Sequence, residues 1–195
     1  MQTTTLSFAN MHTHGELMAN LIRARRQSFT LQNRRELPEA IGGDYDQYDT
    51  PASRWIAVHQ GERILAGIRL TPTTARCGIY SYTIRDAQKG LLEAIPSDLL
   101  SFSAPVDPNV WESSGVFVAH DTPLAIRPRV HGQLITEMTT SARQLGAKRV
   151  LGIIPASWPN WAARCGLDIQ AAGRMLEFDD HVSQCVSISL AETLH

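Results

Sequence analysis

Several features that would narrow the function of this protein are scarce in its sequence. The 195 residues contain only three cysteines, Cys77, Cys165 and Cys185, which lie far apart without metal-ligand spacing. Neither a disulfide framework nor a cysteine metal site is therefore expected. No apolar run approaches the ~20 residues of a membrane-spanning helix. The formal net charge of -1 argues against a general nucleic-acid binder, which needs a basic surface.

The start of the chain and its overall composition predict where and how it folds. Met1 is followed by Gln-Thr-Thr-Thr-Leu, with no basic segment or apolar core, so a cytoplasmic location is expected rather than export. The odd, scattered cysteine count is typical of reduced thiols in that compartment. Hydrophobic residues make up 43% and charged residues 19%. These values predict a single domain over residues 1–195 with a substantial core.

One acidic stretch, residues 43–50, stands out because it precedes the first convincing strand. It reads Gly-Asp-Tyr-Asp-Gln-Tyr-Asp-Thr and places Asp44, Asp46 and Asp49 within six residues. A solvated acidic turn has this composition. A site that holds a cationic substrate, or takes a proton from an amine, has it too.

An amphipathic helix is predicted over residues 15–29, before the acidic stretch. Its apolar face carries Met18, Leu21, Ile22, Arg25 and Phe29. Arg25 either extends its charged end into water or offers a fixed cation in a pocket beside Phe29, and periodicity alone does not separate the two. Residues 30–50 show no period and are long for a connection, which favours a functional lid or a disordered loop.

The remaining pattern predicts strands and helices in alternation. Strands are expected at 54–59, 63–70, 79–83, 110–118, 148–154, 174–178 and 182–190, with helices near 87–95, 128–145 and 158–165. Arg69 lies on the opposite strand face from its apolar neighbours and need not enter the core. The fold class is therefore α+β, with one twisted, mixed sheet flanked by helices.

Three further residue types call for interpretation. Glu112 lies in an apolar strand, where a buried carboxylate is costly unless it is paired or hydrogen-bonded. Gly115 in the middle of the same strand predicts a bulge or a close backbone approach by a ligand. The four tryptophans are interpreted as core residues, because no basic patch accompanies them; they are Trp55, Trp111, Trp158 and Trp161.

Four ordered sequence blocks resemble the acyl-homoserine lactone synthases, the autoinducer synthases of bacterial quorum sensing. The blocks are Arg25-x-x-x-Phe29, Asp44-x-Asp46-x-Tyr48-Asp49, Gly67-x-Arg69-Leu70-x-Pro72-Thr73-Thr74 and Trp111-Glu112-x-Ser114. The third block is the most specific, and the likeness runs from about residue 25 to residue 118. The resemblance implies a fold akin to the N-acetyltransferase superfold.

The resemblance also implies a reaction and the residues that perform it. An acyl group from acyl-carrier protein or acyl-CoA would be joined to the amine of S-adenosylmethionine, and lactonisation would expel methylthioadenosine. These substrates need no further cofactor or metal, and acyl-carrier protein is the expected protein partner. The implied catalytic residues are Glu112 and Asp46. The implied substrate-binding residues are Arg25, Phe29, Asp49, Arg69 and Ser114, with the thioester held between residues 114–117 and 152–154.

The sequence departs from the family pattern in two places. The family has a lid tryptophan where this chain has Arg34-Arg35-Glu36. The family's strand continues as Glu-x-Ser-Arg-Phe, but Gly115 stands here in place of the arginine. Three explanations stay open: another cation such as Arg85 or Arg127 compensates, the substrate differs, or the synthase activity is lost.

Two other functions compete with the synthase. An ordinary acyl-CoA N-acyltransferase of the same superfold would carry a pyrophosphate loop, which residues 129–134 (Arg-Val-His-Gly-Gln-Leu) match except at the last position. A non-catalytic protein that kept a nucleoside pocket is the other alternative. An excess of arginines before the acidic stretch is either a solvated face or a docking surface for an acidic carrier protein, and the second is favoured: Arg23, Arg25, Arg26, Arg34 and Arg35.

Overall fold

The computed structural model describes residues 1–33, 45–159, 165–178 and 181–190. These residues contain seven strands, three α-helices and two short 3₁₀ helices. In order, they are β1 (Gln2–Leu6), η1 (Phe8–Asn10), α1 (Met11–Asn33), β2 (Arg54–Gln60), β3 (Arg63–Pro72), α2 (Thr83–Gln88), β4 (Val110–Val118), η2 (Leu124–Ile126), α3 (Arg127–Gln144), β5 (Arg149–Pro155), β6 (Asp168–Phe178) and β7 (His181–Ser189).

The strands pair in both senses, as the predicted α+β class with a mixed sheet requires. β4 and β5 are parallel, whereas β1–β2, β2–β3, β5–β7 and β6–β7 are antiparallel. The chain divides into two compact units, residues 1–70 with 115–141 and residues 71–114 with 142–195. The interpretation of residues 1–195 as one domain stays a prediction.

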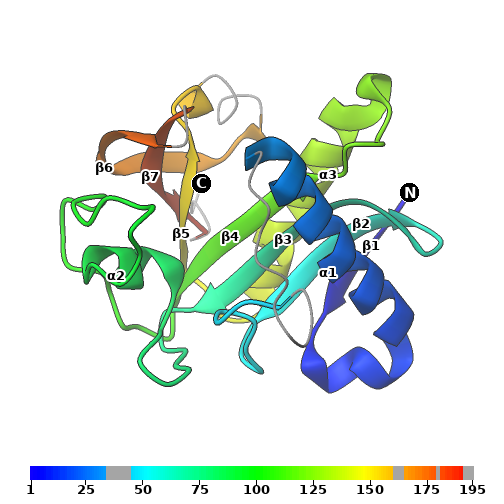
Figure 1. The fold of residues 1–195 in the computed structure, drawn as a ribbon, viewed down its shortest axis with the longest axis horizontal. Coiled ribbons are helices and arrows are strands. Elements are labelled where there is room, and N and C mark those ends of the chain that lie inside the picture. Colours follow the sequence, from blue (N-terminus) through cyan, green and yellow to red (C-terminus); the bar gives the residue numbers. More distant parts are fainter. Residues whose placement is uncertain (34–44, 160–164, 179–180, 191–195) are drawn as a thin grey trace, which may run out of the picture. The chain divides into compact units, whose positions relative to one another are not determined.

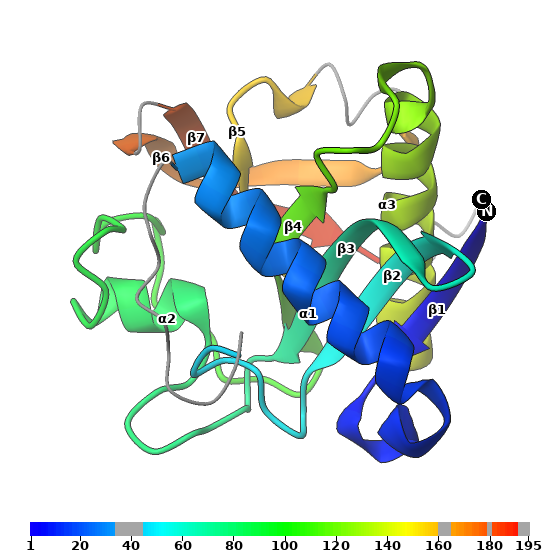
Figure 2. The same cartoon turned by 45° about the vertical axis from the view of Figure 1, so that its right-hand side comes forward.

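In the first unit, helices cover both faces of the β1–β2–β3 strands (Figures 1 and 2). Helix α1 buries Leu17, Met18, Leu21 and Ile22 in a core that also contains strand residues and Phe117. Helix α3 meets β1 on the other face, where the Thr3 hydroxyl donates to Glu137. Because both faces are covered, nearly every side chain of β3 is buried.

Gly67 determines how closely α1 approaches β3. A Cβ at this position would lie 2.5 Å from the Leu21 side chain and 2.8 Å from Phe117, so a larger residue would have to displace these side chains. Arg25 follows Leu21 by one helical turn, and Arg69 follows Gly67 by two strand residues. The two arginines therefore emerge from this contact on facing elements.

The second unit is built on β5, β7, β6 and the first half of β4. Its core includes Tyr82, Ile84, Leu99, Leu151 and Cys185. The parallel pairing of β4 with β5 runs from Val110–Arg149 to Ser113–Gly152.

Most of the predicted elements are present, and three differ. Strand β1 is additional, although its three threonines carry β-propensity. Residues 79–83 do not form the predicted strand, since Tyr80 makes only an isolated bridge and the chain then enters α2. That helix replaces the one expected near 87–95. It is too short for its period to show in the sequence. The predicted helix at 158–165 lies mostly outside the described residues.

Candidate functional site

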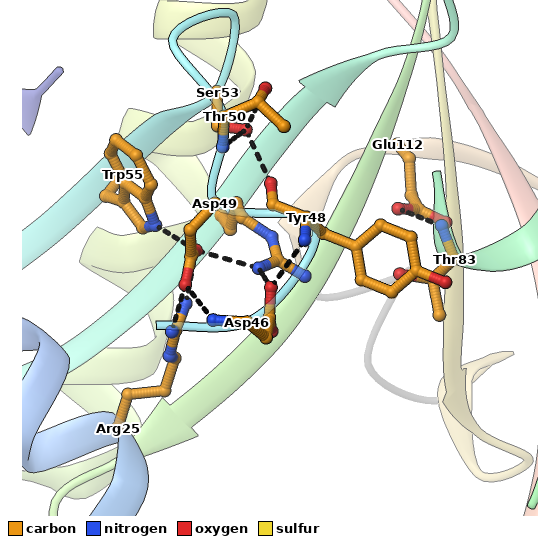
Figure 3. Close-up of polar contacts among 10 residues, drawn as sticks. Arg25, Asp46, Tyr48, Asp49, Thr50, Ser53, Trp55, Thr83 and Glu112 are labelled. Atoms are coloured by element: carbon orange, nitrogen blue, oxygen red, sulfur yellow. Dashed lines mark hydrogen bonds and ion pairs between the residues drawn. The ribbon is translucent and has the colours of Figure 1, made fainter. Parts of the chain in front are cut away.

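A bidentate ion pair between α1 and the acidic stretch forms the centre of the candidate site (Figure 3). Arg25 donates from Nη1 to Asp49 Oδ1 at 2.8 Å and from Nη2 to Oδ2 at 2.5 Å. Arg25 is only 6% exposed, and the Asp49 side chain is fully buried. The parallel two-bond geometry is the strongest form of an arginine–carboxylate contact. Of the two interpretations of Arg25, the one that extends its charge into water is wrong.

Arg69 joins both aspartates from strand β3. Its Nη1 donates to Asp46 Oδ1 at 2.6 Å and to Asp49 Oδ1 at 2.8 Å. The guanidinium also lies 5.5 Å from the centre of the Tyr48 ring, within cation–π range. Arg69 is 3% exposed, so the expectation that it need not enter the core is corrected. We call Arg25, Asp46, Asp49 and Arg69 the charge network.

Asp49 is the member of the network with the most hydrogen-bond donors. Besides the two arginines, the Asp46 backbone amide donates to it at 2.8 Å and the Trp55 indole at 3.2 Å. Burial by itself raises the pKa of Asp49, but the hydrogen bonds and charge of Arg25, with the charge of Arg69, lower it to about 2. For Arg69, burial lowers the pKa and the two aspartates outweigh it, so the pKa of Arg69 is raised. Asp49 and Arg69 are therefore both charged at neutral pH.

Asp46 differs from Asp49 in its access to solvent. Its side chain is 42% exposed, and its Oδ1 accepts hydrogen bonds from Arg69 and from the Tyr48 amide at 2.8 Å. Asp46 is thus held by one oxygen while its carboxylate borders solvent. In chemical terms, it can contact a cation or accept a proton, whereas the carboxylate of Asp49 is enclosed.

The segment that carries the aspartates is folded on itself rather than loosely solvated. The Asp49 amide donates to the Asp46 carbonyl at 3.1 Å, and the Ser53 hydroxyl donates to the Tyr48 carbonyl at 2.8 Å. Ser53 and Thr50 are both buried. These turns fix Asp46 and Asp49 relative to β2. Of the two interpretations of the acidic stretch, the structure therefore favours an ordered site over a solvated turn.

Glu112 and Ser114 belong to the second unit. Glu112 is 1% exposed and accepts hydrogen bonds from the amides of Thr83 at 3.1 Å and Ile84 at 2.7 Å, one on each carboxylate oxygen. It thus satisfies the amides at the start of α2. Burial and then the Glu112 charge raise the pKa of Cys185 to about 12. Ser114 is half-buried on β4. Phe29, on α1 in the first unit, is also half-buried. The binding roles of both residues stay predictions.

Comparison with proteins of known sequence connects this geometry to a family. No protein-family model matches the chain. It is 29% identical over 132 residues to an acyl-homoserine-lactone synthase of Pseudomonas aeruginosa, covering 67% of this chain and 56% of the relative. It is 23% identical over 157 residues to an isovaleryl-homoserine lactone synthase of Bradyrhizobium diazoefficiens, covering 80% of this chain and 63% of the relative. The matches thus span less than two thirds of either relative.

Solved structures extend the likeness to the fold. TofI in complex with an inhibitor and MTA has a TM-score of 0.74 at 21% identity, covering 97% of this chain and 92% of TofI. The CoA-dependent acyl-homoserine lactone synthase BjaI, solved with SAM and isopentyl-CoA, has a TM-score of 0.73 at 20% identity, covering 96% and 82%. The chain is thus similar in sequence and in fold to acyl-homoserine lactone synthases. An acyl-CoA N-acyltransferase from Pseudomonas aeruginosa is also similar, with a TM-score of 0.60 at 15% identity, covering 96% and 99%, as the predicted superfold implies.

Gly115, where the pattern of acyl-homoserine lactone synthases has arginine, lies beside Arg25. Its φ of +62° is left-handed, a conformation that favours glycine, and a Cβ there would lie 3.7 Å from Arg25 Cδ. Arg85 and Arg127 are the two candidates to replace the arginine expected at position 115, and no contact in the described part of the chain places either of them beside Gly115. Arg127 donates to the carbonyls of Thr122 and His120, and Arg85 belongs to the second unit. The atom found within 4 Å of a Cβ at Gly115 belongs to Arg25, the cation that is already bound to Asp49.

Trp55 is the contributor to the site that the sequence did not reveal. It was assigned to the core, and it is indeed buried, but its indole donates to Asp49. An aromatic strand residue six positions after an aspartate carries no recognisable signal for such a contact.

Some predictions concern residues outside the described part of the chain. Most of the predicted lid at 30–50 lies there, including Arg34, Arg35 and Asp44. The first residues of the lid continue α1, and its last residues carry the two aspartates of the charge network. Among the described residues, no helix is long and apolar enough to cross a membrane. The same part of the chain contains no group of three or more histidine, cysteine or acidic residues arranged to hold a metal.

Proposed function

We propose that this protein is an acyltransferase of the acyl-homoserine lactone synthase type. It would join an acyl group to the amine of S-adenosylmethionine, and lactonisation would release methylthioadenosine for quorum sensing. The observation that supports this most is the charge network, in which one half-exposed carboxylate is held by a buried arginine. S-adenosylmethionine carries a permanent sulfonium charge and an amine that must lose a proton before it attacks a thioester, so it needs such a carboxylate.

Asp46 is the better candidate for the base among the two carboxylates predicted to be catalytic. Its side chain is 42% exposed, whereas Glu112 is 1% exposed and accepts an amide on each oxygen. We assign Glu112 to holding the start of α2. Arg25, Asp49 and Arg69, whose side chains are buried, would serve binding by positioning Asp46. The binding roles of Phe29 and Ser114 stay predictions.

The acyl donor is acyl-carrier protein or acyl-CoA. BjaI, solved with SAM and isopentyl-CoA, supports a CoA thioester as one possibility. Arg25 is buried in the network, so it does not belong to the arginine-rich docking surface proposed for a carrier protein. The thioester slot expected at residues 114–117 and 152–154 stays a prediction. The three free cysteines support a reducing, cytoplasmic compartment.

A titration with S-adenosylmethionine followed by a turnover assay tests this function. Calorimetry should show binding, and methylthioadenosine should be released when acyl-carrier protein or acyl-CoA thioesters of several chain lengths are added. Asp46→Asn should abolish most turnover while the protein stays folded. Asp98→Asn is a matched control, since Asp98 also pairs with an arginine but is exposed in the second unit. Equal turnover in both variants would exclude Asp46 as the base.

A generic acyl-CoA N-acyltransferase is the second candidate, and the neighbour with a TM-score of 0.60 favours it. The residues proposed for its pyrophosphate loop, 129–134, lie inside α3 from its third residue onward. A Cβ on Gly132 would meet no atom within 4 Å, so no close approach requires glycine there. Acetyl-CoA turnover without S-adenosylmethionine binding would support this candidate. Binding of S-adenosylmethionine without any turnover would support a non-catalytic homologue.

A further inference from the structure

Trp55 occupies a central position in the site although its ring is buried. It lies on β2, directly across from Arg69 on β3 in the antiparallel register. Its Nε1 donates to Asp49 Oδ1 at 3.2 Å (Figure 3). The same oxygen accepts from Arg25 Nη1 and Arg69 Nη1. Trp55 is therefore the neutral donor in a set of three that converges on one carboxylate oxygen.

Ring contacts fix the orientation of this indole. Phe8 packs edge-on against Trp55 with the ring centres 5.3 Å apart, and Tyr45 stacks on Phe8 at 6.1 Å. Phe8 itself begins η1, which is closed by a capping box between Ser7 and Asn10. Tyr45 begins the described part of the acidic segment. The N-terminal turn, strand β2 and the acidic segment are thus joined through one aromatic cluster.

We propose that Trp55 is a positioning residue for the S-adenosylmethionine site, acting through Asp49. Its N–H fixes the rotation of the Asp49 carboxylate, which in turn aligns Arg25 and Arg69. Arg69 then holds Asp46, the carboxylate that borders solvent. Because a neutral donor adds no charge, it orders Asp49 without competing with the substrate for charge. This inference rests on the proposed function.

The test compares Trp55→Phe with Trp158→Phe. Each substitution keeps an aromatic ring and removes one indole hydrogen bond, since Trp158 Nε1 donates to Gln184 at 2.8 Å in the second unit. Trp55→Phe should weaken S-adenosylmethionine binding about five- to ten-fold, the loss expected for part of one charge-assisted hydrogen bond. The KM for the acyl donor should not change. Trp158→Phe should leave S-adenosylmethionine binding at the wild-type value.

A measurement on the unmodified protein keeps the inference testable if Trp55→Phe does not fold. The indole ¹⁵N–¹H resonance of Trp55 should shift on saturation with S-adenosylmethionine, and that of Trp158 should not. Folded Trp55→Phe that binds S-adenosylmethionine like the wild type would overturn the inference, as would an unshifted Trp55 resonance. Wild-type protein that does not bind S-adenosylmethionine would instead overturn the proposed function.

Discussion

Replacing Asp49 with asparagine separates the structural role of the charge network from its role in binding. Asparagine has nearly the same shape, so Asp49→Asn creates no cavity. The change removes one negative charge from a balanced set of two arginines and two aspartates. It also turns an amide N–H group toward donors that need an acceptor. Arg25 and Arg69, which are 6% and 3% exposed, both lose the charge of the Asp49 carboxylate, and Arg69 keeps its ion pair with Asp46.

The expected loss of stability is large because the remaining charges are buried. Breaking a buried ion pair by removing one partner costs about 3–5 kcal/mol. For a domain of this size, 1 kcal/mol corresponds to roughly 2–4 °C in Tm, so Tm should fall by about 10 °C. Asp46→Asn is the matched control. Its side chain is 42% exposed, and Arg69 keeps its ion pair with Asp49, so a loss below about 1 kcal/mol is expected.

Urea unfolding and S-adenosylmethionine calorimetry on both variants provide the measurement. Asp49→Asn should lose stability and binding together. Asp46→Asn should lose binding while its urea midpoint stays near the wild-type value. If Asp49→Asn unfolds at the wild-type urea concentration, Asp49 does not hold the network together. If Asp46→Asn is the less stable of the two, the division of roles between the aspartates is wrong.

Three further predictions concern pH, α2 and the glycine beside the site. Since the pKa of Asp49 is lowered from 3.8 to about 2, its ionisation adds about 2 kcal/mol of stability above pH 4. Urea titrations should show this lost as pH falls toward 2, and Asp49→Asn should not show that loss. Glu112→Gln keeps one acceptor for two amides and should lower the free energy of unfolding by about 1–3 kcal/mol; unchanged α2 amide exchange would contradict this. Gly115→Ala should cost about 1–2 kcal/mol because φ is +62°, and a stabilised variant in thermal unfolding would refute it.

The secondary structure was predictable where long periodic segments dominate. Helix α3 was expected at residues 128–145 and runs from Arg127 to Gln144. The β2–β3 hairpin was equally clear, because β-rich runs flank a glycine turn. Helix α2 was not predictable, since it has six residues and its first amides are satisfied by Glu112, about thirty residues later. A contact at that separation leaves no local pattern.

The charged members of the site were predictable, but their arrangement was not. Arg25 was recognised as a cation on an apolar helix face, and Asp46, Asp49 and Arg69 through the resemblance to a family. The arrangement of these side chains depends on which of them are buried. Arg69 seemed free to face water because strand alternation shows only that two faces differ. It does not show that helices cover both faces.

The charge network has an arrangement that would let the proposed substrate bind without a loss of stability. Arg69 donates from one nitrogen to both aspartates, at 2.6 Å and 2.8 Å. If Asp46 turns toward a cationic substrate, Arg69 keeps its hydrogen bond to Asp49, so neither buried arginine loses contact with a carboxylate. Asp49 cannot turn toward a substrate in the same way, because it is also the partner of Arg25. Two aspartates three residues apart thus have unequal freedom, and only the one bordering solvent can take part in binding without a cost in stability.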